Sequence, residues 1–381
     1  MRARASSDAL RVAADPERIA MLRLVLVTGV GPLTRQALLS QFTTASAVLD
    51  ASYDQLLTVP GVGPKLARRI LSARRDIDVE DELRVCSEHG LRVLMEADDD
   101  YPRRLREIAD PPGALFVAGE ITEADVLAVA IVGTRHATQY GLQTAERFAY
   151  SLSQAGYTIV SGLARGVDAA AHRGALAAGG RTLAVLGSGI LNLYPPEHGE
   201  LARDIQRQGA VLSEVPPRMA PQAGMFPQRN RVITALSLGV VVIEAAVRSG
   251  ALVSATHAME QGREVFAVPG RIDSRMSHGC HHLIKDGATL VESVDDVLEQ
   301  LGPLTGVARA PDGREIRHAA ELQLNDQERL VLDAIDVSST LVDTVVQRTG
   351  LSAQRILATL TVLEMRRLIR RLSGSTLCRI G

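Results

Sequence analysis

The sequence predicts an α/β protein, with a mostly parallel sheet in the middle of the chain and helical domains before and after it. Three observations support this fold class. In the middle region, apolar stretches end repeatedly in small residues and lead into helical patterns, which is typical of parallel strands joined by helices. Near the N-terminus a Val-x-Gly-Val-Gly-Pro segment occurs twice, at 27–32 and 59–64. The chain closes with three helical patterns and a hairpin.

Length and charge limit the class of protein. The 381 residues are enough for two or three domains. The sequence is 46% hydrophobic and 23% charged, which is typical of a globular protein. A net charge of −2 argues against indiscriminate coating of nucleic acid, but it is compatible with a local basic groove.

Nothing in the sequence indicates a membrane or secreted protein. The longest apolar runs, such as 238–246, are too short to span a bilayer. Asp8, Asp15 and Glu17 precede the first apolar run, which is unlike a signal peptide. The three cysteines are scattered and odd in number, so they imply no disulfide framework. We therefore expect a cytoplasmic protein.

Four segments are expected along the chain. Residues 1–80 are predicted to form a helix-hairpin-helix (SAM-like) domain, and residues 81–303 a Rossmann-like domain. A stretch rich in Gly, Pro and Ala indicates a linker over 304–320. Residues 321–381 are predicted to form a winged-helix domain.

The repeated N-terminal segment is typical of the turn in helix-hairpin-helix modules. Its paired glycines permit backbone conformations closed to other residues, and they leave amides at a helix N-terminus free to meet a phosphate. Lys65 and Arg68 lie beside the second copy, so we expect a secondary DNA contact there. The alternative is that the two hairpins only pack against each other.

Several strand ends of the middle region are expected to meet at one edge of the sheet. Ligands of such sheets bind outside the carboxyl ends of the strands, and helix N-termini at that edge favour phosphate. Within this edge Gly133 would let the backbone approach a ligand, and Arg135 offers forked donors. The candidate binding residues are Gly133, Thr134, Arg135, Thr138, Gly141, Ser161, Gly162, Arg165, Ser249 and Gly250.

The segment Phe226-Pro-Gln-Arg-Asn-Arg231 places two arginines and an asparagine at the start of a helical run. Arg229, Asn230 and Arg231 suit phosphate contact or stacking on bases. The alternative is a salt-bridge cluster with Glu214 or Glu244.

Two other groups of residues resemble catalytic or metal sites. Asp168 and His172 lie four apart on one helix face, as in a carboxylate-oriented general base. No Ser or Cys nucleophile signature accompanies them, so we interpret them as residues that brace the phosphate loop. The run His278-Gly-Cys-His-His282 is spaced too tightly for the usual zinc patterns. No catalytic residue, metal or cofactor is therefore expected.

The C-terminal region shows a winged helix-turn-helix pattern. Helices are predicted over 328–335, 341–348 and 353–365, and a wing over 370–380. Protein–protein contact and duplex DNA binding both remain open for this domain. Its candidate DNA contacts are Arg355, Arg366, Arg367 and Arg370.

Taken together, these segments resemble the DNA-processing protein A (DprA/Smf) family of bacterial natural transformation. The matching segments keep the family's order and cover nearly all of the middle region. They include Ala130-Ile-Val-Gly-Thr-Arg135, Ser161-Gly-Leu-Ala-Arg-Gly-Val-Asp168, Phe226-Pro-Gln-Arg-Asn-Arg231, Val268-Pro-Gly270 and Leu283-Ile-Lys-Asp-Gly-Ala288.

The resemblance implies a homodimeric protein that occurs in bacteria competent for transformation. It implies that this protein catalyses no reaction. Such a protein binds and protects incoming single-stranded DNA, displaces single-strand-binding protein and loads RecA recombinase. The resemblance assigns Gly133–Arg135 to the DNA pocket and Arg229–Arg231 to the same edge. The terminal domains would contact duplex DNA.

The sequence departs from the family at two places. Many members carry a basic residue and then an asparagine after the Tyr-Pro pair, whereas Pro196, Glu197 and His198 follow Tyr194-Pro195 here. This change removes a basic DNA contact from the loop. In the winged helix, Met365-Arg-Arg-Leu368 replaces the usual small turn, which suggests an additional DNA role.

Three other functions are weighed against this one. The main alternative is a nucleotide N-glycosidase of the lysine-decarboxylase-like type, whose Pro-Gly-Gly-x-Gly-Thr loop is replaced here by Val268-Pro-Gly-Arg-Ile272. A NAD-dependent enzyme is disfavoured because G-x-G-x-x-G is missing. The third is a regulator that binds duplex DNA through the winged helix.

Overall fold

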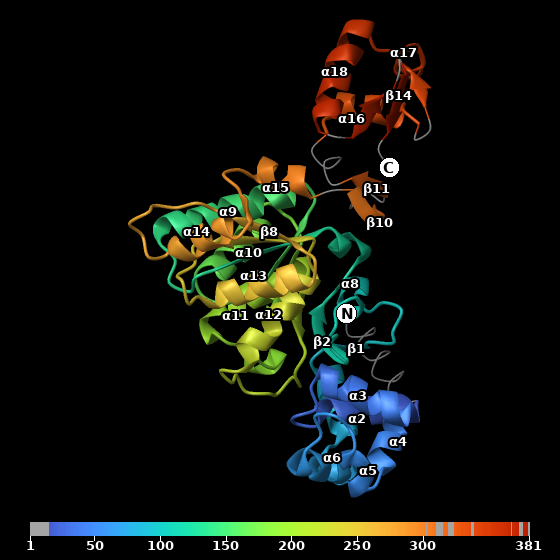
Figure 1. The fold of residues 1–381 in the computed structure, drawn as a ribbon, viewed down its shortest axis with the longest axis vertical. Coiled ribbons are helices and arrows are strands. Elements are labelled where there is room, and N and C mark those ends of the chain that lie inside the picture. Colours follow the sequence, from blue (N-terminus) through green and yellow to red (C-terminus); the bar gives the residue numbers. More distant parts are fainter. Residues whose placement is uncertain are drawn as a thin grey trace.

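The computed structural model describes residues 15–301, 303–309, 315–318, 324–336, 339–366, 368–372 and 376–379. It contains a helical domain, an α/β domain and a winged-helix domain in chain order (Figure 1). The expected fold class is therefore confirmed. No helix in these ranges is long and apolar enough to cross a membrane.

From residue 15 onward, five helices pack around a core of their own in the N-terminal domain. Gly29 and Gly61 adopt the left-handed backbone, with φ of 102° and 83°, at the two predicted hairpin turns. After each turn a helix begins with glycine as its N-cap residue and proline as its first residue. The repeat predicts this arrangement. The helices are α2 (Pro16–Leu26), α3 (Pro32–Phe42), α4 (Ala45–Asp50), α5 (Tyr53–Leu57) and α6 (Pro64–Asp76).

A nine-stranded sheet, in the order β1-β2-β6-β5-β4-β3-β7-β8-β9, forms the α/β domain. All neighbours from β6 to β9 pair in parallel, while β1 and β2 add an antiparallel edge. The strands are β1 (Arg92–Met95), β2 (Ala114–Gly119), β3 (Ala128–Gly133), β4 (Thr158–Ser161), β5 (Thr182–Leu186), β6 (Ala210–Ser213), β7 (Gly239–Ile243), β8 (Glu264–Ala267) and β9 (Thr289–Leu290).

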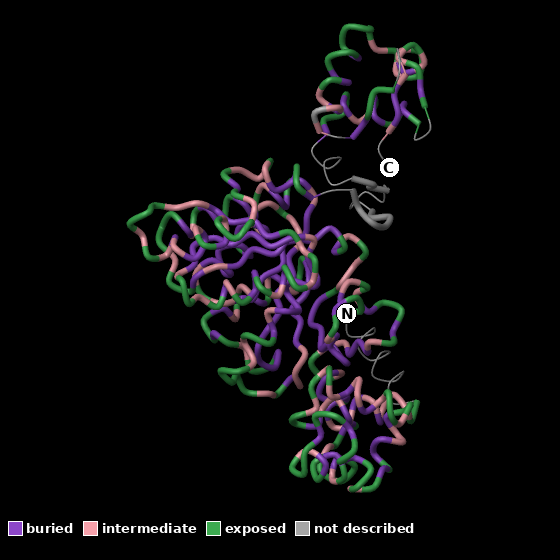
Figure 2. The backbone as a smooth tube through the Cα atoms, in the orientation of Figure 1, coloured by how far each residue is buried: buried purple, intermediate pink, exposed green. Residues whose placement is uncertain are grey.

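Alternate residues along β1 to β8 pack against opposite helical layers, so both faces of this part of the sheet are buried (Figure 2). On β3, for example, Ala130 faces one layer and Ile131 the other. One layer contains α8 (Arg103–Arg106), α12 (Met225–Ala235), α13 (Gly250–Glu260) and α14 (His278–Lys285). The other contains α7 (Val79–Glu88), α9 (Gln139–Gln154), α10 (Val167–Ala177), α11 (Gly199–Gln208) and α15 (Val294–Gln300).

The segment predicted as a linker contains regular structure. β10 (Pro303–Arg309) pairs antiparallel with β11 (Glu315–His318), so a two-stranded sheet follows the α/β domain. The prediction of a linker is based on a composition rich in Gly, Pro and Ala. Such a composition is compatible with backbone pairing between the ends of the segment.

The C-terminal domain has its own apolar core and the predicted order of three helices and a wing. Two short strands flank the wing strand, which pairs with both of them. The elements are α16 (Asp326–Asp333), β12 (Thr340–Leu341), α17 (Val342–Thr349), α18 (Ala353–Met365), β13 (Ile369–Arg371) and β14 (Thr376–Arg379).

Candidate nucleic-acid interface

The order of the strands places a ligand crevice between β3 and β7. The chain runs from β3 outward through β4, β5 and β6, and then returns to build β7, β8 and β9 on the other side of β3. The helices after β3 and β7 therefore diverge, which opens a crevice at the carboxyl ends of these two strands. A groove of about 490 Å³ lies there, within the range of ligand sites.

The groove has a polar rim and an apolar wall. The end of β3 and the loops that follow β3 and β4 meet α12 and the first turn of α13 around it. Its lining comprises Val132, Gly133, Thr134, Arg135, His136, Ala164, Asp168, Tyr194, Ala223, Phe226, Pro227, Arg229, Asn230, Ile233, Ser249, Gly250, Ala251, Val253 and Ser254.

A carboxylate of the protein occupies the N-terminus of α9. Glu244, directly after β7, accepts hydrogen bonds from the amide of Thr138 at 2.8 Å and from its hydroxyl at 2.5 Å. Gly141 packs against the same carboxylate, since a Cβ there would clash with it. Glu244 has a φ of 50°, a strained backbone that a packed site can hold. Thr138 and Gly141 therefore support the edge without lining the groove.

A second internal carboxylate occupies the loop after β4. Asp168 is buried and accepts hydrogen bonds from the amides of Gly162 at 3.1 Å and Ala164 at 3.4 Å. Burial raises the pKa of this carboxyl, while Arg229 and the two amides oppose that shift. His172 is fully buried one turn along α10 and contacts the Thr182 hydroxyl. This geometry agrees with residues that brace the loop.

These two carboxylates determine where an anion can bind. The amides of Thr138 after β3 and of Gly162 and Ala164 after β4 already have internal carboxylate acceptors. These amides are therefore engaged, whereas Arg135 and the first turn of α13 lie at the outer rim of the groove. At that turn Ser249 caps the helix through the amide of Ala251, and the space beside Gly250 is open. A helix N-terminus in this setting favours negative charge.

Exposed arginines and aromatic rings form a mixed cluster at the rim. The Arg135 guanidinium lies 5.2 Å from the centroid of the Phe226 ring. The Arg165 guanidinium lies 5.9 Å from the centroid of Tyr194, whose ring is 5.6 Å from that of Phe226. Within the described chain Arg135 has no ion-pair partner. This rim therefore offers both a free cation and flat apolar surfaces.

Arg229 forms the floor of the groove. It is only 6% exposed, and it donates to the carbonyl oxygen of Gly162 at 2.7 Å and to that of Val185. Burial lowers its pKa to about 10, while the charge of Asp168 opposes that shift. Asn230 beside it accepts a bond from Arg229 and donates to the carbonyl of Gly250 at 3.3 Å, which ties α12 to α13.

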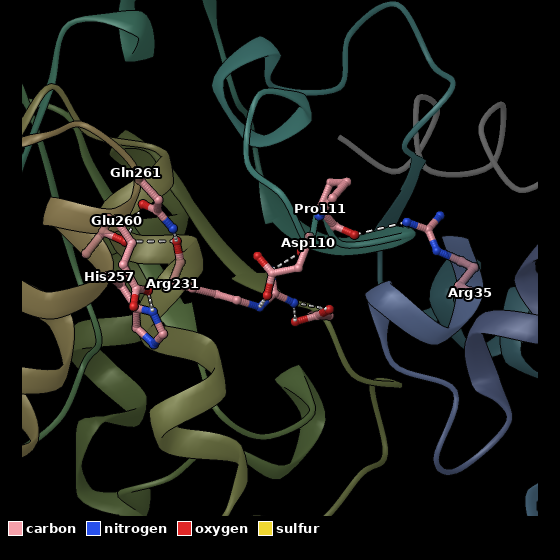
Figure 3. A network of polar contacts seen from close by, with 9 residues as sticks. Arg35, Asp110, Pro111, Arg231, His257, Glu260 and Gln261 are labelled. Atoms are coloured by element: carbon pink, nitrogen blue, oxygen red, sulfur yellow. Dashed lines mark hydrogen bonds and ion pairs between the residues drawn. The ribbon is translucent and has the colours of Figure 1, made fainter. Parts of the chain in front are cut away.

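Arg231 lies outside the groove, and its placement supports the alternative of an ion-pair cluster. It is buried and binds Glu214 at 2.5 and 2.6 Å and Asp110 at 3.1 Å. Figure 3 shows it at the centre of a polar network, with Gln261 donating to its carbonyl. Next to Asp110, the carbonyl of Pro111 accepts a bond from Arg35 of the helical domain at 3.0 Å. These contacts favour a structural role for Arg231, and a DNA contact there stays a prediction.

The remaining predicted residues of the α/β domain also divide into residues that support the site and residues that line it. Ser161 is fully buried and donates to the carbonyl of Ile131 at 2.6 Å, so it also supports the site from below. Gly162 and Arg165 line a small pocket that adjoins the groove. The groove itself is lined by Gly133, Thr134, Arg135, Arg229, Asn230, Ser249 and Gly250.

Sequence reasoning missed the aromatic wall. Phe226 and Tyr194 line the groove beside Arg135, and Ala223 and Val253 extend its apolar side. One signal was available, because both rings directly precede a proline in segments already noted for the family resemblance.

The candidate contacts of the terminal domains lie on exposed surface for the most part. Lys65, Arg68, Arg355 and Arg370 are exposed, while Arg366 lies 3.9 Å from Glu328. Arg367 is outside the described residues. The two hairpins do approach each other, since Gly29 faces Leu66 and Arg69, but Gly31 and Gly63 face open space.

Fold and groove define a protein that combines a doubly wound sheet with two domains of nucleic-acid-binding type. Residues 92–302 match the family described as DNA recombination-mediator protein A. Residues 315–375 match the DprA winged helix domain, and residues 21–76 match the SAM-like helix-hairpin-helix tandem. The chain belongs to the DNA recombination-mediator protein A family.

Individual relatives agree with this assignment. Protein Smf of Escherichia coli is 38% identical over 317 residues, which cover 81% of this chain and 83% of the relative. The X-ray structure of DprA from Streptococcus pneumoniae has a TM-score of 0.63 at 35% identity, covering 74% of this chain and 97% of that one. DNA processing protein A from Helicobacter pylori, studied for its single-stranded DNA binding mode, has a TM-score of 0.50 at 31% identity, covering 54% and 93%.

Proposed function

We propose that this chain binds single-stranded DNA in the groove between the ends of β3 and β7. We further propose that it acts as a recombination mediator without catalysing a reaction. In this role a homodimer protects DNA that enters during natural transformation, displaces single-strand-binding protein and loads RecA. Family membership supports the role, and the Helicobacter pylori relative is described for binding single-stranded DNA.

The observation that carries the binding site is the placement of Arg135. Its side chain is exposed at the rim of the groove and stacks over Phe226. A guanidinium beside an aromatic ring suits a single strand, because it can meet the phosphate while the ring stacks on the neighbouring base. Duplex DNA hides its bases in the stack, so the same site favours single strands.

The two internal carboxylates favour this role over a nucleotide N-glycosidase. A mononucleotide phosphate bound at the amides after β3 or β4 would meet Glu244 or Asp168. A strand at the rim avoids both. Incubation with nucleoside monophosphates should therefore release no free base, and base release that is lost in Asp168→Asn would contradict the proposal.

The binding experiment compares matched single-stranded and duplex oligonucleotides over a salt series. The full chain should bind the single strand more tightly, and Arg135→Ala should weaken that binding. Arg147→Ala is the control, because Arg147 is an exposed arginine on α9 outside the groove lining. Equal affinity of wild type and Arg135→Ala, or an equal loss in Arg147→Ala, would remove the groove as the binding site.

The terminal domains have an auxiliary role in this proposal. The exposed Lys65 and Arg68 of the helical domain and Arg355 and Arg370 of the winged helix provide contacts for duplex DNA. Their removal should weaken duplex binding more than single-strand binding, since the groove is built from the α/β domain alone.

A further inference from the structure

One contact at the rim pairs an arginine with a carboxylate. Arg165, on the loop between β4 and α10, donates from Nε to Oε1 of Glu197 at 2.5 Å. Glu197 belongs to the short 3-10 turn Pro196–His198, which follows Tyr194. The two side chains are 50% and 48% exposed, and Arg165 lines the pocket that it shares with Arg135 and Phe226. A carboxylate is thus paired with an arginine that lines this pocket.

Glu197 takes the position in which a phosphate would meet Arg165. Carboxylate and phosphate present the same kind of acceptor oxygen to a guanidinium, and each can use its forked donors. The contrast with Arg135 is direct, because that side chain has an aromatic neighbour and no ion-pair partner in the described chain. One of the two rim arginines is therefore available to a ligand, and the other is engaged.

The ion pair between Arg165 and Glu197 contributes little to the stability of the fold. An exposed ion pair contributes little to stability, because solvent screens it. The turn that carries Glu197 is fixed independently, since the buried His198 bonds through Nδ1 to the carbonyl of Leu163 at 2.9 Å. The loop that carries Arg165 is fixed by Asp168. Arg165 also holds the pKa of Glu197 below its usual range, so the carboxylate stays charged at neutral pH.

We propose that Glu197 competes with a DNA phosphate for Arg165 and so limits the affinity of the groove for single strands. This inference rests on the proposed function. A strand that already contacts Arg135 holds its next phosphates at high local concentration, so it can displace the carboxylate. A free nucleotide or phosphate lacks that advantage. Glu197 therefore selects for a polymer over its monomers.

The test is a double-mutant cycle in the full chain, read as affinity for a single-stranded oligothymidylate over a salt series. Glu197→Gln keeps the shape of the side chain and removes its charge. It should bind about two- to fivefold more tightly, which is the size of an exposed ion pair, and the slope of log affinity against log salt should steepen because salt screens that pair. In an Arg165→Ala background the same substitution should change neither quantity.

The matched control is Glu200→Gln. Glu200 lies three positions along the chain, is 91% exposed and pairs only loosely with Arg203 at 3.7 Å. Its substitution removes the same charge from the same region and should leave affinity nearly unchanged. An equal gain in both glutamine variants would reduce the effect to net charge and overturn the proposal.

Two further outcomes would also overturn it. Weaker binding by Glu197→Gln would mean that the carboxylate holds Arg165 in its binding geometry. A gain that persists without Arg165 would mean that Glu197 repels DNA directly. Failure of the proposed function can be told apart from failure of the Glu197 proposal. If the proposed function fails, the wild-type chain itself shows no preference for single strands.

Discussion

Two pairs of arginines at the same edge of the sheet differ in burial and in their partners. Arg135 and Arg165 are exposed at the rim, whereas Arg229 and Arg231 are each only 6% exposed. The buried pair is satisfied by internal acceptors, namely the carbonyls of Gly162 and Val185 for Arg229 and two carboxylates for Arg231. The comparison teaches that the edge gathers cations, and that burial against internal acceptors withdraws Arg229 and Arg231 from the surface while Arg135 and Arg165 stay exposed.

The strongest test of the comparison is Arg231→Ala. Removal of this side chain would leave Glu214 and Asp110 without their cation. Burial already raises the pKa of Glu214, and Arg231 opposes that shift. Breaking a buried ion pair costs about 3–5 kcal/mol. We expect that loss in the free energy of unfolding, measured by urea denaturation.

A second variant covers the case in which Arg231→Ala does not fold. Arg231→Met combined with Glu214→Gln removes both charges, so part of the stability should return. Stable Arg231→Ala protein with weak DNA binding would instead place this arginine on the binding surface and break the comparison.

The exposed pair should behave in the opposite way. Arg135→Ala should cost roughly 1–3 kcal/mol of single-strand binding whatever the sequence of the strand. The salt slope should fall by about 0.7, because one phosphate contact is lost. Arg135→Lys should restore only part of the binding, since the fork is missing. The urea midpoint should match wild type, and a variant that loses binding only because it unfolds would shift the site assignment away from Arg135.

A substitution in the aromatic wall can distinguish the contribution of base stacking from that of charge. Phe226→Leu keeps an apolar side chain but removes the flat ring beside Arg135. Loss of base stacking is expected to cost about 1–3 kcal/mol of binding, with the salt slope unchanged because no cation is removed. Oligonucleotide titrations at two salt concentrations measure both quantities. A changed slope would mean that the ring mainly positions Arg135.

The sequence predicts which residues meet at this edge, because strand ends and helix starts follow from local patterns. It does not predict which partner each side chain takes. Thr138 and Glu244 are 106 positions apart, and Arg231 and Asp110 are 121 apart. The left-handed backbone of Glu244 has no local signal, since that conformation is unusual for any residue other than glycine. Burial and pairing are thus decided by long-range packing, which a single sequence does not encode in its local patterns.

The same distinction between buried and exposed groups extends to proton binding at His172. Thr182 donates its hydroxyl proton to the carbonyl of Ile159 at 2.7 Å, so it can only accept from Nδ1 of His172, also at 2.7 Å. The ring proton therefore sits on Nδ1. The other nitrogen, Nε2, is buried without a hydrogen-bond partner among the described residues. A second proton there would create a buried, unpaired charge, and burial accordingly lowers the pKa of His172 to about 3.

The low pKa of His172 determines in which direction the free energy of unfolding changes with pH. In the unfolded chain a histidine gains its proton near pH 6.5, whereas the folded protein excludes it until about pH 3. Stability from this group is complete above pH 6.5 and is lost as the pH falls. Between pH 7.5 and 5.5 the loss is about 1.4 kcal/mol. His172→Gln cannot gain a proton, so its unfolding free energy should fall by that much less over the same interval. Parallel curves for the two proteins would mean that His172 gains its proton at the same pH in the fold as in the unfolded chain, and the contrast between buried and exposed groups would not extend to it.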